Sequence, residues 1–205
     1  MTDLVCVVAD KNMKAAMEGI LGRHQALGIV APTYEIVVHP DRDPGCFHRG
    51  HELLRGHRTR ARHGLLVLDR AWSGAPIGSG SDLEKLVEAN PAWQDLCEWA
   101  KVVVIDPELE AWVFAGSPHV AAMLGVSGGV EELRSALGQF WAAGAPKPRD
   151  PKAAVEWALR KARKPRSSAL YRQLAATVSL EGCSDRSFLR LREILRAWFV
   201  RRRAT

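Results

Sequence analysis

The sequence predicts an α/β fold in which a parallel β-sheet is flanked by helices, and two patterns support this. Four short apolar runs are rich in β-branched residues and have the length of strands: residues 4–8, 34–38, 64–68 and 101–105. The runs are continuously apolar instead of alternating, which is typical of strands buried on both faces. Segments with helical periodicity lie between them, at residues 12–23, 48–62 and 81–99.

Beyond residue 105 the strand pattern ends, and the rest of the chain is predicted to be helical. Amphipathic segments are expected at residues 118–124, 130–143, 151–163, 167–178 and 185–201. Residues 144–151 hold three prolines and a glycine, which makes this segment the best candidate for a boundary. We therefore expect an α/β core over residues 1–143 and a basic helical C-terminal subdomain over residues 144–205.

The net charge of +6 combines two parts of opposite sign. Residues 1–146 contain 13 Lys and Arg against 18 Asp and Glu, a balance of −5, whereas residues 147–205 contain 16 against 5, a balance of +11. A basic segment can bind the phosphate backbone of DNA or RNA, and an acidic one can hold a metal ion. An ordinary solvated basic surface would give the same composition.

Several features predict a protein of the cytoplasm. No run approaches the roughly 18 apolar residues of a membrane span, and residues 1–9 lack the charged start and the cleavage site of a signal peptide. Four cysteines, Cys6, Cys46, Cys97 and Cys183, are far apart in the chain and form no C-x-x-C pair. We therefore expect reduced thiols and no contact with a membrane.

Acidic residues follow three of the four predicted strands. Asp10 follows the first strand, Asp69 the third and Asp106 the fourth, with Glu108 and Glu110 close behind. In an open parallel sheet these strand ends meet at one edge, where ligands bind. Clustered carboxylates repel one another and are commonly held by Mg²⁺, which also binds phosphate oxygens. All five acids are therefore candidate metal ligands.

The same acids also allow a purely structural interpretation. An Asp after a strand is a common helix N-cap, which accepts hydrogen bonds from free backbone N–H groups without any metal. Asp106 precedes Pro107, and Asp-Pro is typical of a helix start. The coincidence of acids at three strand ends favours a shared site.

Residues 39–46 form a second group of polar residues after the second predicted strand. Their prolines and glycine predict a loop that places His39 and Asp43 over the same edge of the sheet. Cys46, His48 and His51 could bind zinc, although their spacing is not that of a common closed zinc site. The histidines could equally be ordinary surface residues.

A basic cluster lies at residues 161–166, before Ser167 and a predicted helix start. Basic side chains beside a helix N-terminus can hold phosphate, whereas Ser167 is a natural N-cap. The expected nucleic-acid contacts are Lys11, His39, Asp43, Lys161, Arg163, Lys164 and Arg166.

Short motifs spread along the chain match one known family. They lie at residues 8–11, 39–45, 66–69, 107–112, 165–171 and 187–191, together with Cys183. On these motifs the whole chain resembles bacterial antiphage defence proteins with a degenerate Toprim core, related to the Toprim domains of overcoming-lysogenization-defect nucleases. It is most similar to a small component of the methylation-associated defence system. The resemblance implies a Toprim-like fold and metal-dependent phosphodiester chemistry as one activity of that fold.

The chain departs from the Toprim pattern at two positions. Toprim enzymes carry a glutamate after the first strand, where this chain has Ala9 followed by Asp10. Their later Asp-x-Asp pair is Asp69-Arg70-Ala71 here, so only the first acid is kept. Glu110 fits an acid that the family retains. Loss of one ligand weakens the case for a two-metal centre.

The leading hypothesis is a defence protein that binds DNA or RNA through its basic half. On this hypothesis it can cleave phosphodiesters with Mg²⁺ held by the catalytic residues Asp10, Asp69 and Glu110. The alternative is a non-catalytic subunit that binds a methyltransferase, a nuclease or nucleic acid within a larger complex. A phospho-receiver is a third interpretation, but no matching lysine follows a later strand.

Overall fold

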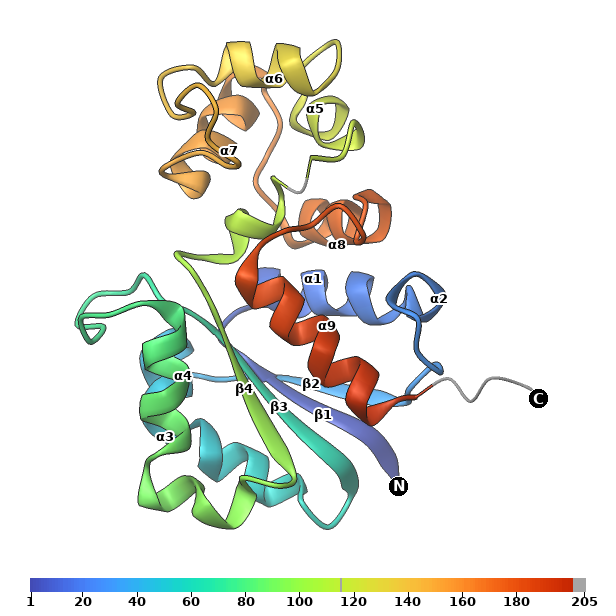
Figure 1. Cartoon of the computed structure of the whole chain (residues 1–205), viewed down its shortest axis with the longest axis vertical. Helices are drawn as coiled ribbons and strands as arrows, with labels where there is room; N and C mark the ends of the chain where they lie inside the picture. The colour runs from blue at the N-terminus through green and yellow to red at the C-terminus, as the bar shows by residue number, and fades with distance from the viewer. Residues whose placement is uncertain (115, 201–205) are drawn as a thin grey trace.

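The computed structural model describes residues 1–114 and 116–200 and contains one four-stranded parallel sheet. Its strands are β1 (Thr2–Val8), β2 (Tyr34–Val38), β3 (Ala61–Asp69) and β4 (Ala100–Ile105). They are arranged in the order β2-β1-β3-β4, and every neighbouring pair is parallel (Figure 1). The predicted α/β fold is therefore confirmed, and it is consistent with a Toprim-like core.

The register of the strands aligns their carboxyl ends. Val8 of β1 pairs with Val38 of β2 and with Val67 of β3, while Asp69 of β3 pairs with Ile105 of β4. The two central strands β1 and β3 are almost entirely buried along their apolar stretches, as expected for a sheet covered on both faces. The residues that follow the strands are consequently brought to one edge.

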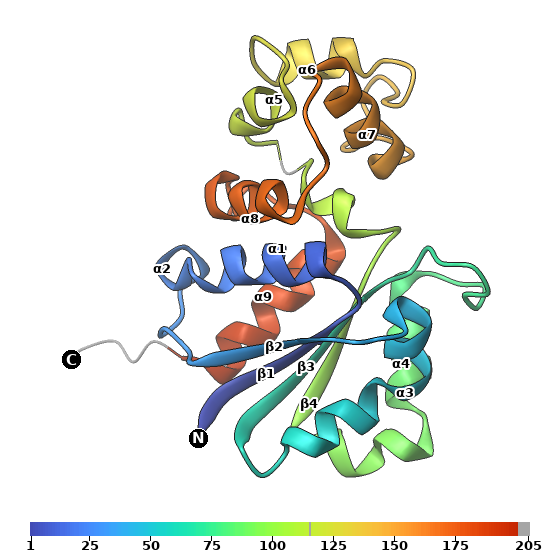
Figure 2. The same ribbon diagram turned by 180° about the vertical axis from the view of Figure 1, so that it is seen from behind.

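Helices cover both faces of the sheet. One face packs against α3 (Arg42–His57) and α4 (Gly80–Glu88), with the short 3₁₀ helix η1 (Pro91–Leu96) beside them. The other face packs against α1 (Lys11–Leu21) and α9 (Arg186–Trp198), as Figure 2 shows from behind. The short helix α2 (His24–Leu27) lies near the end of α9.

The remaining helices lie beyond the carboxyl ends of the strands. After β4 the chain passes through η2 (Leu109–Trp112) into α5 (His119–Leu124), α6 (Val130–Ala136) and α7 (Pro151–Lys161), which gather at the top of Figure 1. Helix α8 (Ser168–Thr177) then packs along α1, and α9 returns to the sheet. The predicted domain boundary at residues 143–144 lies between α6 and α7.

Element boundaries differ from the predicted ones at several places. Helix α3 spans Arg42–His57 instead of residues 48–62, and α6 ends at Ala136 instead of residue 143. The segment after β2 does not form a long loop, because α3 begins at Arg42 and includes Pro44 and Gly45 in its first turn. The helix expected at residues 81–99 is interrupted after Glu88, where Asn90 caps η1 and Pro91 begins it. None of the described helices is long and apolar enough to cross a membrane.

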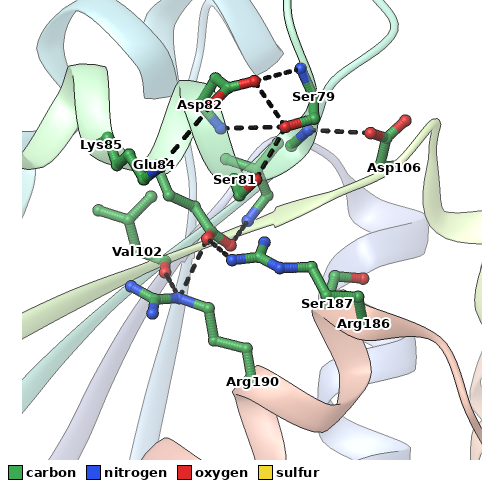
Figure 3. A network of polar contacts seen from close by, with 12 residues as sticks. Ser79, Ser81, Asp82, Glu84, Lys85, Val102, Asp106, Arg186, Ser187 and Arg190 are labelled. Atoms are coloured by element: carbon green, nitrogen blue, oxygen red, sulfur yellow. Dashed lines mark hydrogen bonds and ion pairs between the residues drawn. The ribbon is translucent and has the colours of Figure 1, made fainter.

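A buried carboxylate joins α4, the edge strand β4 and α9. The side chain of Glu84 is 3% exposed; its Oε1 accepts a hydrogen bond from Val104 N at 3.0 Å, and its Oε2 lies 2.7 Å from Arg186 Nη2. Arg190 Nε lies 3.3 Å from the same oxygen and donates to the carbonyl of Val102 at 2.9 Å (Figure 3). Two arginines of α9 thus neutralise Glu84 and fix α9 against β4.

We expect Glu84→Ala to lower the free energy of unfolding by about 2–3 kcal/mol, because it leaves the buried Val104 N without its acceptor, whereas Arg186 and Arg190 are partly exposed and can be hydrated. Glu88→Ala is the matched control, since Glu88 is partly exposed and shares only Arg190. The Glu88→Ala substitution should lower the free energy of unfolding by about 1 kcal/mol or less. Denaturant unfolding followed by circular dichroism measures both, and equal effects of the two substitutions would contradict this role of Glu84.

Candidate active site at the carboxyl edge of the sheet

Three aspartates converge where β1 and β3 end and α1 and α3 begin. Asp10 is the N-cap of α1, since its Oδ1 accepts a hydrogen bond from Met13 N at 2.8 Å. Asp43 lies in the first turn of α3, and its Oδ1 accepts a hydrogen bond from Asp69 N at 2.8 Å. This bond fixes the start of α3 to the end of β3. Asp43 was predicted as a nucleic-acid contact but not as a member of the acid cluster.

The electrostatics of Asp69 show that the cluster is crowded with negative charge. Burial raises the pKa of Asp69 well above its usual value, and repulsion from Asp43, Glu110, Glu108 and Asp10 raises it further. Burial also raises the pKa of Asp43, with a further contribution from Asp10. The predicted catalytic acids Asp10, Asp69 and Glu110 are therefore close enough for their charges to act on one another.

One oxygen of this cluster has no partner among the described residues. Asp69 Oδ1 is buried and accepts no hydrogen bond. Asp69 also caps no helix, unlike Asp10, so the structural interpretation does not account for it. An unpartnered buried carboxylate oxygen is costly, and it is a natural ligand for a cation.

Glu108 and Glu110 meet basic side chains from the helical part of the chain. Lys152 Nζ, at the start of α7, lies 2.8 Å from Glu108 Oε2, and Arg166 Nη2 lies 2.8 Å from Glu110 Oε1. The hydroxyl of Tyr171 also donates a hydrogen bond to Glu110 Oε1. Glu110 is only 1% exposed, and Arg166 supplies the positive charge that neutralises it. Burial nevertheless keeps the pKa of Glu108 above its ordinary value.

Asp106 differs from the other four predicted metal ligands because it faces α4. Its Oδ1 accepts a hydrogen bond from Arg70 Nε at 2.8 Å, and its Oδ2 accepts one from Gly80 N at 2.9 Å. It lines a separate pocket of about 420 Å³ between the starts of α4 and α9, together with Lys147 and Arg186. Figure 3 shows Asp106 beside Ser79 at the start of α4.

The predicted nucleic-acid contacts have different surroundings. Lys11, Lys161 and Arg163 are exposed. Lys164 Nζ donates to the carbonyls of Ala122 and Met123 at the end of α5, as a C-terminal cation does. The basic segment before α8 therefore contains both structural and exposed cations, and Lys161 Nζ lies 5.5 Å from the centre of the Trp157 ring. Ser167 is the N-cap of α8, as expected.

His39 is one of the predicted contacts that is not at the surface. It is 4% exposed, its Nδ1 accepts a hydrogen bond from Asp41 N, and burial lowers its pKa. Its ring lies against Gly45, where even a methyl group would not fit. His39 consequently fixes the turn between β2 and α3 and does not reach a ligand in this conformation.

The zinc interpretation is not supported by the geometry of α3. Cys46 is buried whereas His48 is exposed, because residues two apart point to different faces of a helix. Across residues 1–114 and 116–200, no group of three or more His, Cys, Asp or Glu side chains is arranged to hold a metal ion. The charge and the free oxygen of the aspartate cluster suit Mg²⁺, but its carboxylates would have to rotate to form a coordination shell.

Comparisons of the chain with protein-family models, with curated proteins and with solved structures found no match. The fold and the site together therefore define a class: an α/β protein with a four-stranded parallel sheet and a carboxylate cluster at the carboxyl edge of that sheet. Its activity has to be inferred from the chemistry of that cluster.

The raised pKa of Asp69 predicts a pH dependence of stability. A carboxyl group whose pKa is higher in the folded state than in the unfolded state binds protons more tightly when folded, so stability falls as the pH rises above the unfolded value of 3.8. Asp69→Asn removes this penalty. The melting temperature of the variant should rise relative to that of the wild type as the pH increases above the unfolded value of 3.8.

The measurement is thermal unfolding without divalent cations. Asp95→Asn is a control of opposite sign, since hydrogen bonds from Arg55 lower the pKa of Asp95. This variant should lose stability relative to the wild type as the pH rises. A difference between Asp69→Asn and the wild type that does not change with pH would contradict the electrostatic role of Asp69.

The role of Arg166 can be separated from that of its basic neighbours. Arg166→Ala leaves the buried carboxylate of Glu110 with Tyr171 alone, and we expect a loss of about 2–3 kcal/mol, less than for a fully buried pair because Arg166 is partly exposed. Arg163→Ala should change the free energy of unfolding by no more than about 0.5 kcal/mol. Denaturant unfolding of both variants tests this, and equal losses would refute the structural assignment.

Proposed function

We propose that the protein binds nucleic acid in the cytoplasm and cleaves phosphodiester bonds with Mg²⁺ at the cluster of Asp10, Asp43 and Asp69. The observation that carries this proposal is the unpartnered, buried Asp69 Oδ1 inside a group of mutually repelling carboxylates. Such a group is stabilised when a divalent cation binds to it. The resemblance to degenerate Toprim proteins supports the same chemistry and a role in antiphage defence.

Each residue of the site has a part in this reaction. When bound, Mg²⁺ supplies a nucleophilic water and neutralises the charge that develops on the phosphate. Asp43 positions Asp69 through the hydrogen bond to its backbone N–H. The cap bond of α1 uses Oδ1 of Asp10, so on this proposal Oδ2 of Asp10 is the oxygen that binds the cation. Arg166 and Tyr171 hold Glu110 in place beside them.

Basic residues around the cluster can bind the phosphates of the substrate. Lys11 is exposed directly after Asp10. Lys161 and Arg163 extend this positive charge over the helical part of the chain. Cations in these places attract a phosphate backbone, and the affinity should fall steeply as salt rises.

A non-catalytic subunit is the second candidate function, and one observation favours it. Lys152 and Arg166 already neutralise Glu108 and Glu110 without any metal, as in a Toprim core that has lost its chemistry. In that case the protein would bind nucleic acid or a partner such as a methyltransferase or nuclease of the same defence system.

The two functions differ in their response to Asp69→Asn. For an enzyme, we expect Mg²⁺-dependent cleavage of labelled DNA or RNA to fall by at least about 100-fold, phage protection to be lost, and Mg²⁺ to stop raising the melting temperature. Asp95→Asn, far from the carboxyl edge, should leave all three unchanged. Full protection by a folded Asp69→Asn protein would exclude catalysis and leave the subunit function.

A further inference from the structure

Three aromatic rings form a patch on the surface beside the acid cluster. The aromatic patch consists of Phe47 and His48 of α3 and Trp72 of the loop that follows β3. Ring centroids lie 4.9 Å apart for Phe47 and His48, 5.7 Å for Phe47 and Trp72, and 6.2 Å for His48 and Trp72. His48 is exposed and the other two rings are half-buried, so the patch keeps a face toward solvent.

The aromatic patch and the acid cluster are formed by the same two segments of the chain, α3 and the end of β3. Phe47 follows Asp43 by four residues in α3, so the two lie on one helix face about one turn apart. Trp72 follows Asp69 by three residues, and Asp43 and Asp69 are joined by the hydrogen bond described above. The two acids and the two larger rings therefore come from the same pair of segments.

Two positively charged side chains lie on the same edge of the sheet as the rings. Lys11 and Arg42 are exposed at the starts of α1 and α3, on the same edge of the sheet. A surface with aromatic faces next to cations is the combination with which proteins bind unpaired nucleotides.

We propose that the aromatic patch is a stacking site for an unpaired nucleobase, so that the substrate of this edge is single-stranded nucleic acid. Bases of a duplex are already stacked on their neighbours and offer no free face, whereas an unpaired base can stack on a protein ring. The phosphate beside that base then meets Lys11 and Arg42 near the aspartates. This inference rests on the proposed function, because it names the substrate of the same site.

The test compares an oligothymidylate with an abasic strand of the same length, which has the phosphates but no bases. Binding is measured by fluorescence anisotropy in EDTA, so that no cleavage occurs. The wild type should bind the oligothymidylate roughly 5- to 150-fold more tightly, the gain from stacking one base. Trp72→Ala should abolish this preference and leave the affinity for the abasic strand unchanged, while Trp72→Phe should keep part of it.

Tyr34→Ala is the matched control, since Tyr34 is exposed on β2 at the opposite end of the strand, and its preference should equal that of the wild type. Equal wild-type affinity for the two strands would overturn the stacking site while the proposed function stands. Duplex DNA bound as tightly as the oligothymidylate would also overturn it. Failure to bind either strand would overturn both this inference and the nucleic-acid function on which it rests.

Discussion

The repulsion among carboxylates at the carboxyl edge is the constraint on which the rest of the structure depends. A parallel register brings the ends of β1, β3 and β4 together, and the acids that follow these strands cannot disperse. Each of these carboxylates must cap a helix, pair with a cation or keep a raised pKa. Asp10 caps α1, Glu108 and Glu110 are paired with cations, and Asp69 is left with a raised pKa.

This constraint also explains how the helical part is attached. Lys152 at the start of α7 and Arg166 before α8 reach back to acids of the segment that follows β4. Part of the positive charge of the C-terminal half therefore neutralises acids of the core. In α9, Arg186 and Arg190 neutralise Glu84 in the same way. Lys161 and Arg163, in contrast, are exposed.

The four strands and their parallel arrangement could be predicted because continuous apolar runs leave few other folds. The clustering of Asp10 and Asp69 followed from the same rule, since their positions are fixed by strand ends. The rotation of Asp106 toward α4 could not be predicted, because it depends on Arg70 and Gly80, which approach it only in three dimensions. The pairing of Arg166 with Glu110 likewise joins residues far apart in the chain.

The contacts of Glu84 and Arg190 have a consequence for association of the sheet with other chains. Val104 N and the carbonyl of Val102 belong to the outer side of β4, where an added strand would need free backbone groups. Both groups are occupied by side chains of α4 and α9, so this side of the sheet resists edge-to-edge aggregation. Growth of the sheet by a strand from another polypeptide would have to begin at β2, which is short and bounded by Pro32 and Pro40.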